Sequence, residues 1–119
     1  MPVRSLNSSI LKWPDKQQVH EAARDWAEKL GTKDSNILAM GYFGSYARDD
    51  WGVGSDLDLI IILKSSGKAF EQRPLEWDLT RFPVPAEAIV YTQAEWRSLL
   101  EQKNRFAESL VSETVWLDL

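Results

Sequence analysis

In this chain of 119 residues, the strongest candidates for a functional site are two carboxylates that lie two residues apart at the start of an apolar run. Asp56 and Asp58 lead into Ile60-Ile61-Ile62-Leu63. Side chains alternate along a strand, so both carboxylates would share one face and repel each other unless a cation lies between them. Hard divalent cations such as Mg²⁺ take oxygen ligands and often keep a substrate phosphate in their coordination shell. The pair therefore predicts a metal site that acts on phosphate.

A second short motif, Gly44-Ser45, lies between an apolar segment and a predicted helical turn. Backbone N–H groups at a helix start attract anions, and glycine lets the chain approach the ligand closely. Each motif alone is more often ordinary structure, a turn for Gly-Ser and a solvated strand end for Asp-x-Asp. Together, with ten residues between Ser45 and Asp56, they predict a phosphate cradle beside a two-carboxylate metal site, as phosphoryl transfer requires.

The stretch that holds both motifs reads Gly-Ser-Tyr-Ala-Arg-Asp-Asp-Trp-Gly-Val-Gly-Ser-Asp-Leu-Asp-Leu from Gly44 to Leu59. It resembles the signature of the DNA polymerase β-like nucleotidyltransferase superfamily, including the Ala-Arg after the first Ser and the Ser before the first Asp. The short chain is similar to the minimal nucleotidyltransferases, whose genes often accompany a partner with a higher eukaryote and prokaryote nucleotide-binding (HEPN) domain. The resemblance implies the nucleotidyltransferase fold.

The resemblance also implies a role for each matching residue. Gly44 and Ser45 would hold the β- and γ-phosphates of the substrate, expected to be ATP. Asp56 and Asp58 would be catalytic residues that bind the two expected Mg²⁺ ions. Arg48 would either steady the helical turn or bind a phosphate, and a purely structural ion pair accounts for it equally well.

The family's third carboxylate, usually Asp on a later strand, helps to hold one metal and takes the proton of the acceptor hydroxyl. The corresponding catalytic residue and metal ligand here is Glu87, in the segment Pro85-Ala86-Glu87-Ala88-Ile89-Val90-Tyr91. Its extra methylene displaces the carboxylate by about one bond length, and a misplacement of about 1 Å costs on the order of a hundredfold in rate. We therefore expect weakened activity rather than none. Asp78 is a rival candidate, in a segment that is less typical of a strand.

Asp49 is a second departure from the family pattern, which often has Gly at this position. Asp tolerates a positive φ better than most residues, so the substitution is compatible with a left-handed backbone. Its negative charge would weaken nucleotide binding unless Arg48 or a metal offsets it.

The elements predicted around these motifs form a small α/β (α+β) domain, in which helices pack against a mixed sheet of three to four strands. Helices are predicted at 14–30, where Gly31 would form the C-terminal cap, and after the capping box Thr92-Gln93-Ala94-Glu95. Strands are predicted at 37–43, 56–64 and 86–91, with a short strand at 114–117 and one short helix within 70–80. Residues 1–119 are expected to form a single domain.

Composition excludes several other kinds of site. The chain has no cysteine and one histidine, His20, which excludes a disulfide scaffold, a thiolate zinc site and a His pair. His20 is expected on the exposed side of the first helix. The 14 Lys+Arg and 18 Asp+Glu give a net charge of −4, which disfavours nucleic-acid binding by charge. The longest apolar run, Leu59–Leu63, is too short to span a membrane, so a cytoplasmic location without a membrane partner is expected.

The function that these features favour is metal-dependent transfer of a nucleoside monophosphate, AMP from ATP being the expected case, to a hydroxyl. The chain is too short for a separate acceptor-binding domain, so we expect the acceptor on a protein partner in a homo- or hetero-oligomer. By resemblance this partner is a HEPN toxin and this chain its antitoxin. The alternative is a catalytically weak antitoxin, a binding module that neutralises its partner by complex formation; Glu87, Asp49 and the six tryptophans motivate it. Transfer to a small molecule such as an antibiotic is a weaker third hypothesis.

Overall fold

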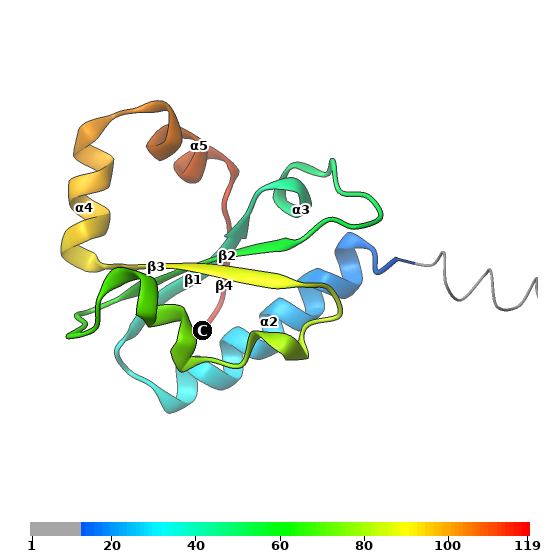
Figure 1. Cartoon of the computed structure of the whole chain (residues 1–119), viewed down its shortest axis with the longest axis horizontal. Coiled ribbons are helices and arrows are strands. Elements are labelled where there is room, and N and C mark those ends of the chain that lie inside the picture. The colour runs from blue at the N-terminus through cyan, green and yellow to red at the C-terminus, as the bar shows by residue number, and fades with distance from the viewer. Residues whose placement is uncertain (1–12) are drawn as a thin grey trace, which may run out of the picture.

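The computed structural model of the protein describes residues 13–119, which form a mixture of helices and strands (Figure 1). The strands are β1 (Ile37–Phe43), β2 (Leu57–Leu63), β3 (Ala86–Thr92) and β4 (Val115–Leu117). The longer helices are α2 (Lys16–Lys33), α4 (Gln93–Gln102) and α5 (Arg105–Glu113). A single helical turn, α3 (Ser45–Arg48), follows β1. The connection from β2 to β3 contains two 3₁₀ segments, η1 (Phe70–Glu76) and η2 (Leu79–Arg81).

The strands form one sheet in the order β3-β2-β1-β4. Strand β1 is antiparallel to both β2 and β4, whereas β2 and β3 are parallel. Every residue of β2 except Asp58 is buried. The continuous apolar sequence of β2 is typical of such a strand, because a strand covered on both faces has no solvated side for polar residues. The predicted small mixed sheet with packed helices is thus confirmed.

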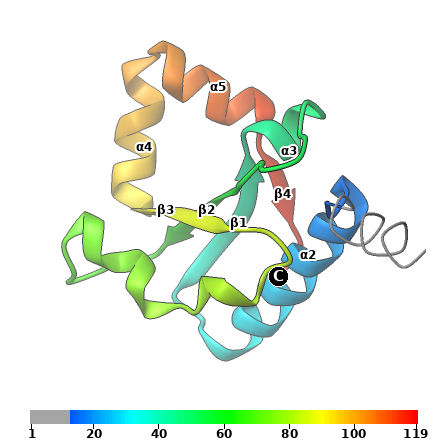
Figure 2. The ribbon, with the colours of Figure 1, turned by 45° about the vertical axis from the view of Figure 1, so that its right-hand side comes forward.

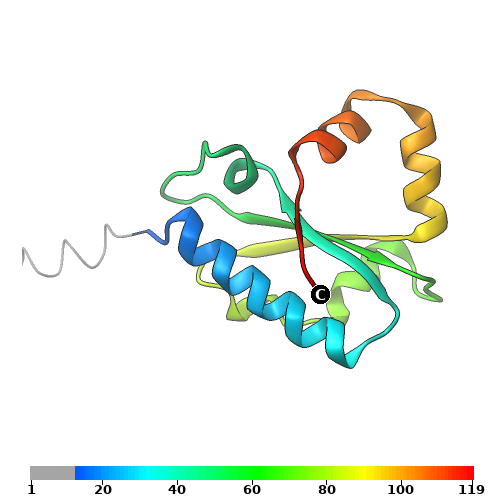
Figure 3. The same ribbon diagram turned by 180° about the vertical axis from the view of Figure 1, so that it is seen from behind.

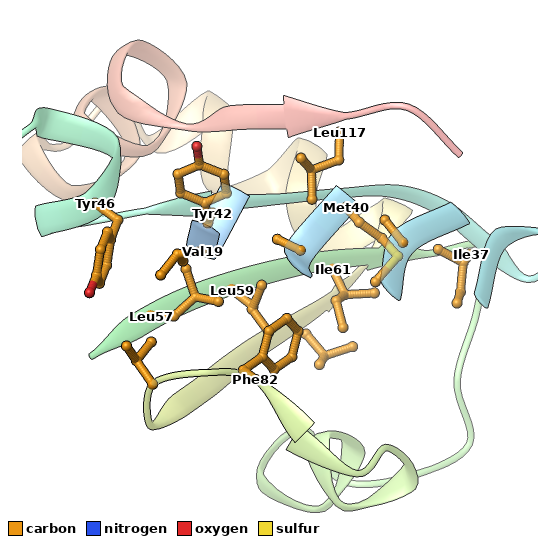
Figure 4. Close-up of a cluster of buried hydrophobic side chains, with 14 of the residues drawn as sticks. Val19, Ile37, Met40, Tyr42, Tyr46, Leu57, Leu59, Ile61, Phe82 and Leu117 are labelled. Carbon is orange, nitrogen blue, oxygen red and sulfur yellow. The ribbon is translucent and has the colours of Figure 1, made fainter. Parts of the chain in front are cut away.

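Helix α2 covers one face of the sheet (Figure 3). A capping box in which Asp15 and Gln18 exchange hydrogen bonds fixes its start. Its buried stripe, with the helical spacing that the sequence predicts, consists of Val19, Ala23 and Ala27. These short side chains pack against the larger apolar cluster, which Figure 4 shows with Met40, Tyr42, Leu57, Leu59, Ile61 and Phe82 among its members.

Helices α4 and α5 lie on the opposite face and connect the two edge strands, β3 and β4 (Figures 1 and 2). A smaller cluster on this face joins Ile60 and Ile62 of β2 to Leu110 of α5. Side chains alternate along a strand, so Asp58 lies on the same face as Ile60 and Ile62. The two helices therefore stand over the face that carries the predicted site. Within residues 13–119, no helix has the length and apolar character needed to cross a membrane.

Two local expectations differ from the structure. Gly31 does not end α2, which continues to Lys33. A Cβ at Gly31 would lie 2.9 Å from the Cβ of Leu119, so this glycine allows close packing of the chain end instead of a left-handed turn. The segment after β2 forms two 3₁₀ segments rather than one short helix, and Pro74 within the first of them has no N–H to donate.

Candidate nucleotidyltransferase site

The predicted phosphate loop begins where β1 meets the helical turn α3. Gly44, the N-cap of this turn, has φ 78° and ψ −152°, a combination that is essentially restricted to glycine. A Cβ at this position would collide with Oδ2 of Asp58. The backbone of the loop therefore lies directly against one of the predicted metal ligands.

The register of the sheet brings the second and third predicted carboxylates together. Asp58 of β2 is the register partner of Glu87 on the parallel strand β3. On its other side Asp58 pairs with Phe43, the residue before Gly44. Partners in register point to the same side of a sheet, and Asp56 comes two residues before Asp58, at the same end. The fold thus places all three carboxylates beside the phosphate loop.

The electrostatics of this cluster centre on Asp58. Burial raises the pKa of the Asp58 carboxyl, and the carboxylates of Glu87 and Asp56 raise it further, whereas Arg48 acts in the opposite direction. Asp56 and Glu87 themselves are exposed. A bound cation would relieve the repulsion among the three, and an all-oxygen donor set suits Mg²⁺. Within residues 13–119 no three Asp, Glu or His side chains converge on one metal position, so the fit to the ion rests on the chemistry of the donor oxygens.

A pocket of about 400 Å³ opens between the phosphate loop and α5. The loop and β2 line one wall of it with Gly44, Ser45, Arg48 and Asp58. The other wall is one face of α5, with residues spaced as successive helical turns require: Phe106, Ser109, Leu110 and Glu113. The volume falls in the range of roughly 300–1,000 Å³ that is typical of ligand sites. The second wall could not be predicted from the sequence, because the pattern of α5 indicates an apolar face but not what that face contacts.

Comparison with known proteins shows to which family the domain with this site belongs. Residues 23–117 match the family model described as a nucleotidyltransferase domain. The chain belongs to this family. The fold is also similar to a crystal structure, at 1.40 Å resolution, of a Sulfolobus solfataricus protein that is itself named only as a candidate nucleotidyltransferase. The TM-score is 0.56 at 17% sequence identity, over 85% of this chain and 80% of that chain. A search of curated proteins gave no match.

Membership of the nucleotidyltransferase family confirms the resemblance seen in the sequence and supports nucleotidyl transfer as the general activity. The matched residues include the phosphate loop, the three carboxylates and the α5 wall of the pocket. The similarity to the Sulfolobus structure supports the fold independently of the motif.

In this nucleotidyltransferase domain, two carboxylates hold Arg48. Its Nε lies 3.1 Å from Oδ2 of Asp50, and its Nη1 lies 3.3 Å from Oε2 of Glu113. Both pairs are accessible to solvent, so each contributes little to stability. The pair with Glu113 nevertheless joins the phosphate loop to α5.

Asp49 has the left-handed backbone that a position often occupied by glycine requires, with φ 65°. Its Oδ1 accepts a hydrogen bond of 2.7 Å from Nζ of Lys16 at the start of α2. This ion pair offsets the negative charge of Asp49 beside the predicted phosphate loop. Lys16 was not predicted as part of the site, because it is 33 residues away in the chain.

The loop between the two motifs is held on α3 by aromatic stacking. The rings of Trp51 and Tyr46 lie 5.6 Å apart between centroids and 9° from parallel. Tyr46 is fully buried, and its hydroxyl accepts a hydrogen bond of 2.9 Å from Nε1 of Trp13. These contacts fix the loop that leads from the phosphate cradle to Asp56.

Two other residues considered from the sequence have structural roles elsewhere. Asp78 lies outside the strands and caps η2, where its side chain accepts a hydrogen bond from the Thr80 N–H. The expectation that His20 is exposed was wrong: it is half-buried, with Nδ1 2.8 Å from the hydroxyl of Tyr42. Tyr42 belongs to the cluster under α2, on the sheet face opposite Asp58.

Proposed function

We propose that this domain transfers a nucleoside monophosphate, AMP from ATP, to a hydroxyl acceptor with release of pyrophosphate. The observation that carries the proposal is the register pairing of Asp58 with Glu87 beside the backbone of Gly44. Membership of the nucleotidyltransferase family supports the general chemistry.

In this proposal the backbone of the loop and the Ser45 hydroxyl hold the β- and γ-phosphates. Asp56, Asp58 and Glu87 would hold Mg²⁺, which would neutralise the charge of the triphosphate when bound. Glu87 takes the proton of the acceptor hydroxyl as the acceptor oxygen bonds to the α-phosphorus. The bond from that phosphorus to the bridging oxygen breaks, and its electrons leave with pyrophosphate.

The proposed acceptor is a hydroxyl, such as that of a tyrosine, on a HEPN-domain toxin, which this chain neutralises as a cytoplasmic antitoxin. The resemblance to the minimal nucleotidyltransferases supports this partner. Exposed apolar side chains near β4 provide a surface of the kind that protein partners cover. Three of them line a second pocket of about 440 Å³, between the sheet and α4: Leu38, Val111 and Trp116.

Incubation with ATP labelled on the α-phosphate, Mg²⁺ and a HEPN-domain protein from the same gene neighbourhood tests the proposal. We expect label on the partner with the unaltered chain and none with the double variant Asp56→Asn/Asp58→Asn. Asp25→Asn, which neutralises an exposed carboxylate of α2, is the matched control and should transfer label normally. Equal transfer by the double variant, or no transfer by the unaltered chain, would contradict an enzymatic function.

Two observations favour a second candidate, an antitoxin that is catalytically weak and acts by binding alone. The carboxylates of Asp50 and Glu113 already engage Arg48, and no three metal ligands converge in the described part of the chain. For this function, the Asp56→Asn/Asp58→Asn variant would still neutralise the toxin, whereas Trp116→Ala would not. An enzymatic antitoxin would lose neutralisation with the double variant.

A further inference from the structure

The α5 wall of the pocket carries an aromatic side chain that the proposed chemistry does not use. Phe106 is 46% exposed and lines the same pocket as Ser45 and Asp58. It belongs to neither apolar cluster of the described residues, although Leu110, one helical turn further along, is buried against the sheet. A half-exposed Phe beside a polar pocket, with no structural use in the core, is a surface on which a flat ligand can pack.

The α5 wall of the pocket has a polar end and an apolar end, just as a nucleotide has charged phosphates at one end and a flat base at the other. Glu113 at the end of α5 pairs with Arg48 of the phosphate loop. Phe106 lies near the start of α5, which at 1.5 Å per residue places it about 10 Å along the helix axis from Glu113. The α5 wall is thus polar at Glu113, beside Arg48, and apolar where Phe106 and Leu110 line the pocket.

We propose that Phe106 is the platform on which the nucleobase of the substrate stacks. The inference rests on the proposed function, because it assigns the position of the base of the same nucleotide whose phosphates lie at Gly44 and Ser45. Leu110, buried in the cluster with Ile60 and Ile62, holds the α5 wall against the sheet before the ligand binds. A fixed platform loses little conformational freedom on binding. Every base has a face that stacks on an aromatic ring, so the platform favours the larger face of a purine without reading its hydrogen-bonding edge.

Titration calorimetry of the full chain with ATP, and separately with inorganic tripolyphosphate, both with Mg²⁺, separates the base from the phosphates. Phe106→Ala should weaken ATP binding about tenfold and leave tripolyphosphate binding unchanged. Phe106→Tyr retains the ring and should bind ATP as the unaltered chain does. Leu75→Ala is the control, because it truncates an exposed apolar side chain of η1 that does not line this pocket.

Unchanged ATP affinity in Phe106→Ala would overturn the inference. An equal loss of affinity for both ligands would also overturn it, since that result would mean that Phe106 only supports the position of α5. An unaltered chain that binds tripolyphosphate as tightly as ATP contradicts the base platform alone. An unaltered chain that binds neither ligand contradicts the proposed function itself, and the platform with it.

Discussion

At the scale of single residues, the carboxylate of Asp58 suits the proposed metal site but is expected to lower the stability of the metal-free protein. Asp58 is half-buried, the one residue of β2 that is not fully buried, and this partial burial together with two neighbouring carboxylates raises its pKa. Folding therefore makes Asp58 harder to deprotonate than it is in the unfolded chain, whereas a metal ligand must be deprotonated. A residue that serves a site in this way typically reduces the stability of the ligand-free protein.

Replacing Asp58 tests this conflict. Because its folded-state pKa is raised above its unfolded value, ionised Asp58 opposes folding more and more as the pH rises from its ordinary pKa through the raised one. Asp58→Asn should therefore increase the free energy of unfolding of the metal-free chain by about 1 kcal/mol near neutral pH. The difference should shrink in acid below the ordinary pKa of Asp, where Asp58 is protonated in both states. Urea denaturation at the two pH values measures both quantities.

Adding Mg²⁺ should reverse the order of stability, because the ion stabilises only a chain that can bind it. The unaltered chain and Asp25→Asn should gain stability with Mg²⁺, and Asp58→Asn should not. A metal-free Asp58→Asn chain that is less stable than the unaltered one near neutral pH would show that the carboxylate supports the fold.

At the scale of elements, the junction between β1 and α3 requires glycine for two separate reasons. The backbone of Gly44 is in a region that other residues avoid, and its missing Cβ leaves room for the carboxylate of Asp58. Gly54 also has a positive φ, 89°, but faces open space, and Gly67 has neither constraint. The three glycines thus have two, one and none of these constraints, and can serve as controls for one another.

Three alanine substitutions separate the two causes. Gly67→Ala should change the free energy of unfolding by less than about 0.5 kcal/mol. Gly54→Ala should cost about 1 kcal/mol from backbone strain alone. Gly44→Ala should cost about 2 kcal/mol or more and should also weaken tripolyphosphate binding, because the loop must move away from Asp58. Equal losses of stability at Gly44 and Gly54 in chemical denaturation would refute a role for the contact with Asp58.

At the scale of the whole molecule, one buried cation ties the crossover between β2 and β3 to α4. Arg73 of η1 is the buried charged residue of the described chain. Its guanidinium bonds both carboxylate oxygens of Glu95, at 2.6 and 3.2 Å, and donates to the carbonyl of Val90 at 3.0 Å. The Arg73 guanidinium, with help from the Thr92 N–H, lowers the pKa of Glu95 to about 2.

This lowered pKa predicts how acid acts on the fold. Ionised Glu95 contributes stability at pH values above its ordinary pKa, and that contribution is lost as the pH falls towards about 2. Glu95→Gln keeps an oxygen for the Thr92 N–H but removes the charge. It should cost about 1 kcal/mol near neutral pH, a value that allows for the solvent exposure of Glu95, and almost nothing near pH 2.

Acid titration of the unfolding free energy measures the effect of Glu95→Gln. Glu101→Gln, at an exposed position of the same helix, should not change the curve. A constant difference between Glu95→Gln and the unaltered chain at all pH values would indicate lost packing instead of lost charge.

Local sequence signals were sufficient to predict most of the helices and strands. The apolar run of β2 and the capping box at Thr92 and Glu95 predicted structure correctly because both depend on neighbours in the chain. The same reliance on chain neighbours made the prediction at Gly31 wrong, because it treated this glycine as the C-terminal cap of the first helix. Its role depends on Leu119, which no local rule connects with it.

The sequence could name the residues of the candidate site but could not predict how they are arranged. The motif named Gly44 and Asp58, yet only the strand register places Asp58 beside Glu87. The Lys16 partner of Asp49 and the α5 wall with Phe106 depend on tertiary packing between elements that are far apart in the sequence. Spacing specifies contacts within one element, whereas contacts between elements are decided by how the faces pack.

The strand connections also determine the order in which the site assembles. Strands β1 and β2 are consecutive and antiparallel, so closing one hairpin brings Gly44 to Asp58. Parallel pairing of β3 with β2 must wait until the whole crossover at 64–85 is in place, and closing that longer loop costs more chain entropy. We therefore expect Glu87 to join Gly44 and Asp58 only after these two have met during folding, and to separate from them first when the molecule opens locally. A partly opened molecule would keep its phosphate cradle while it lacks its proposed proton acceptor.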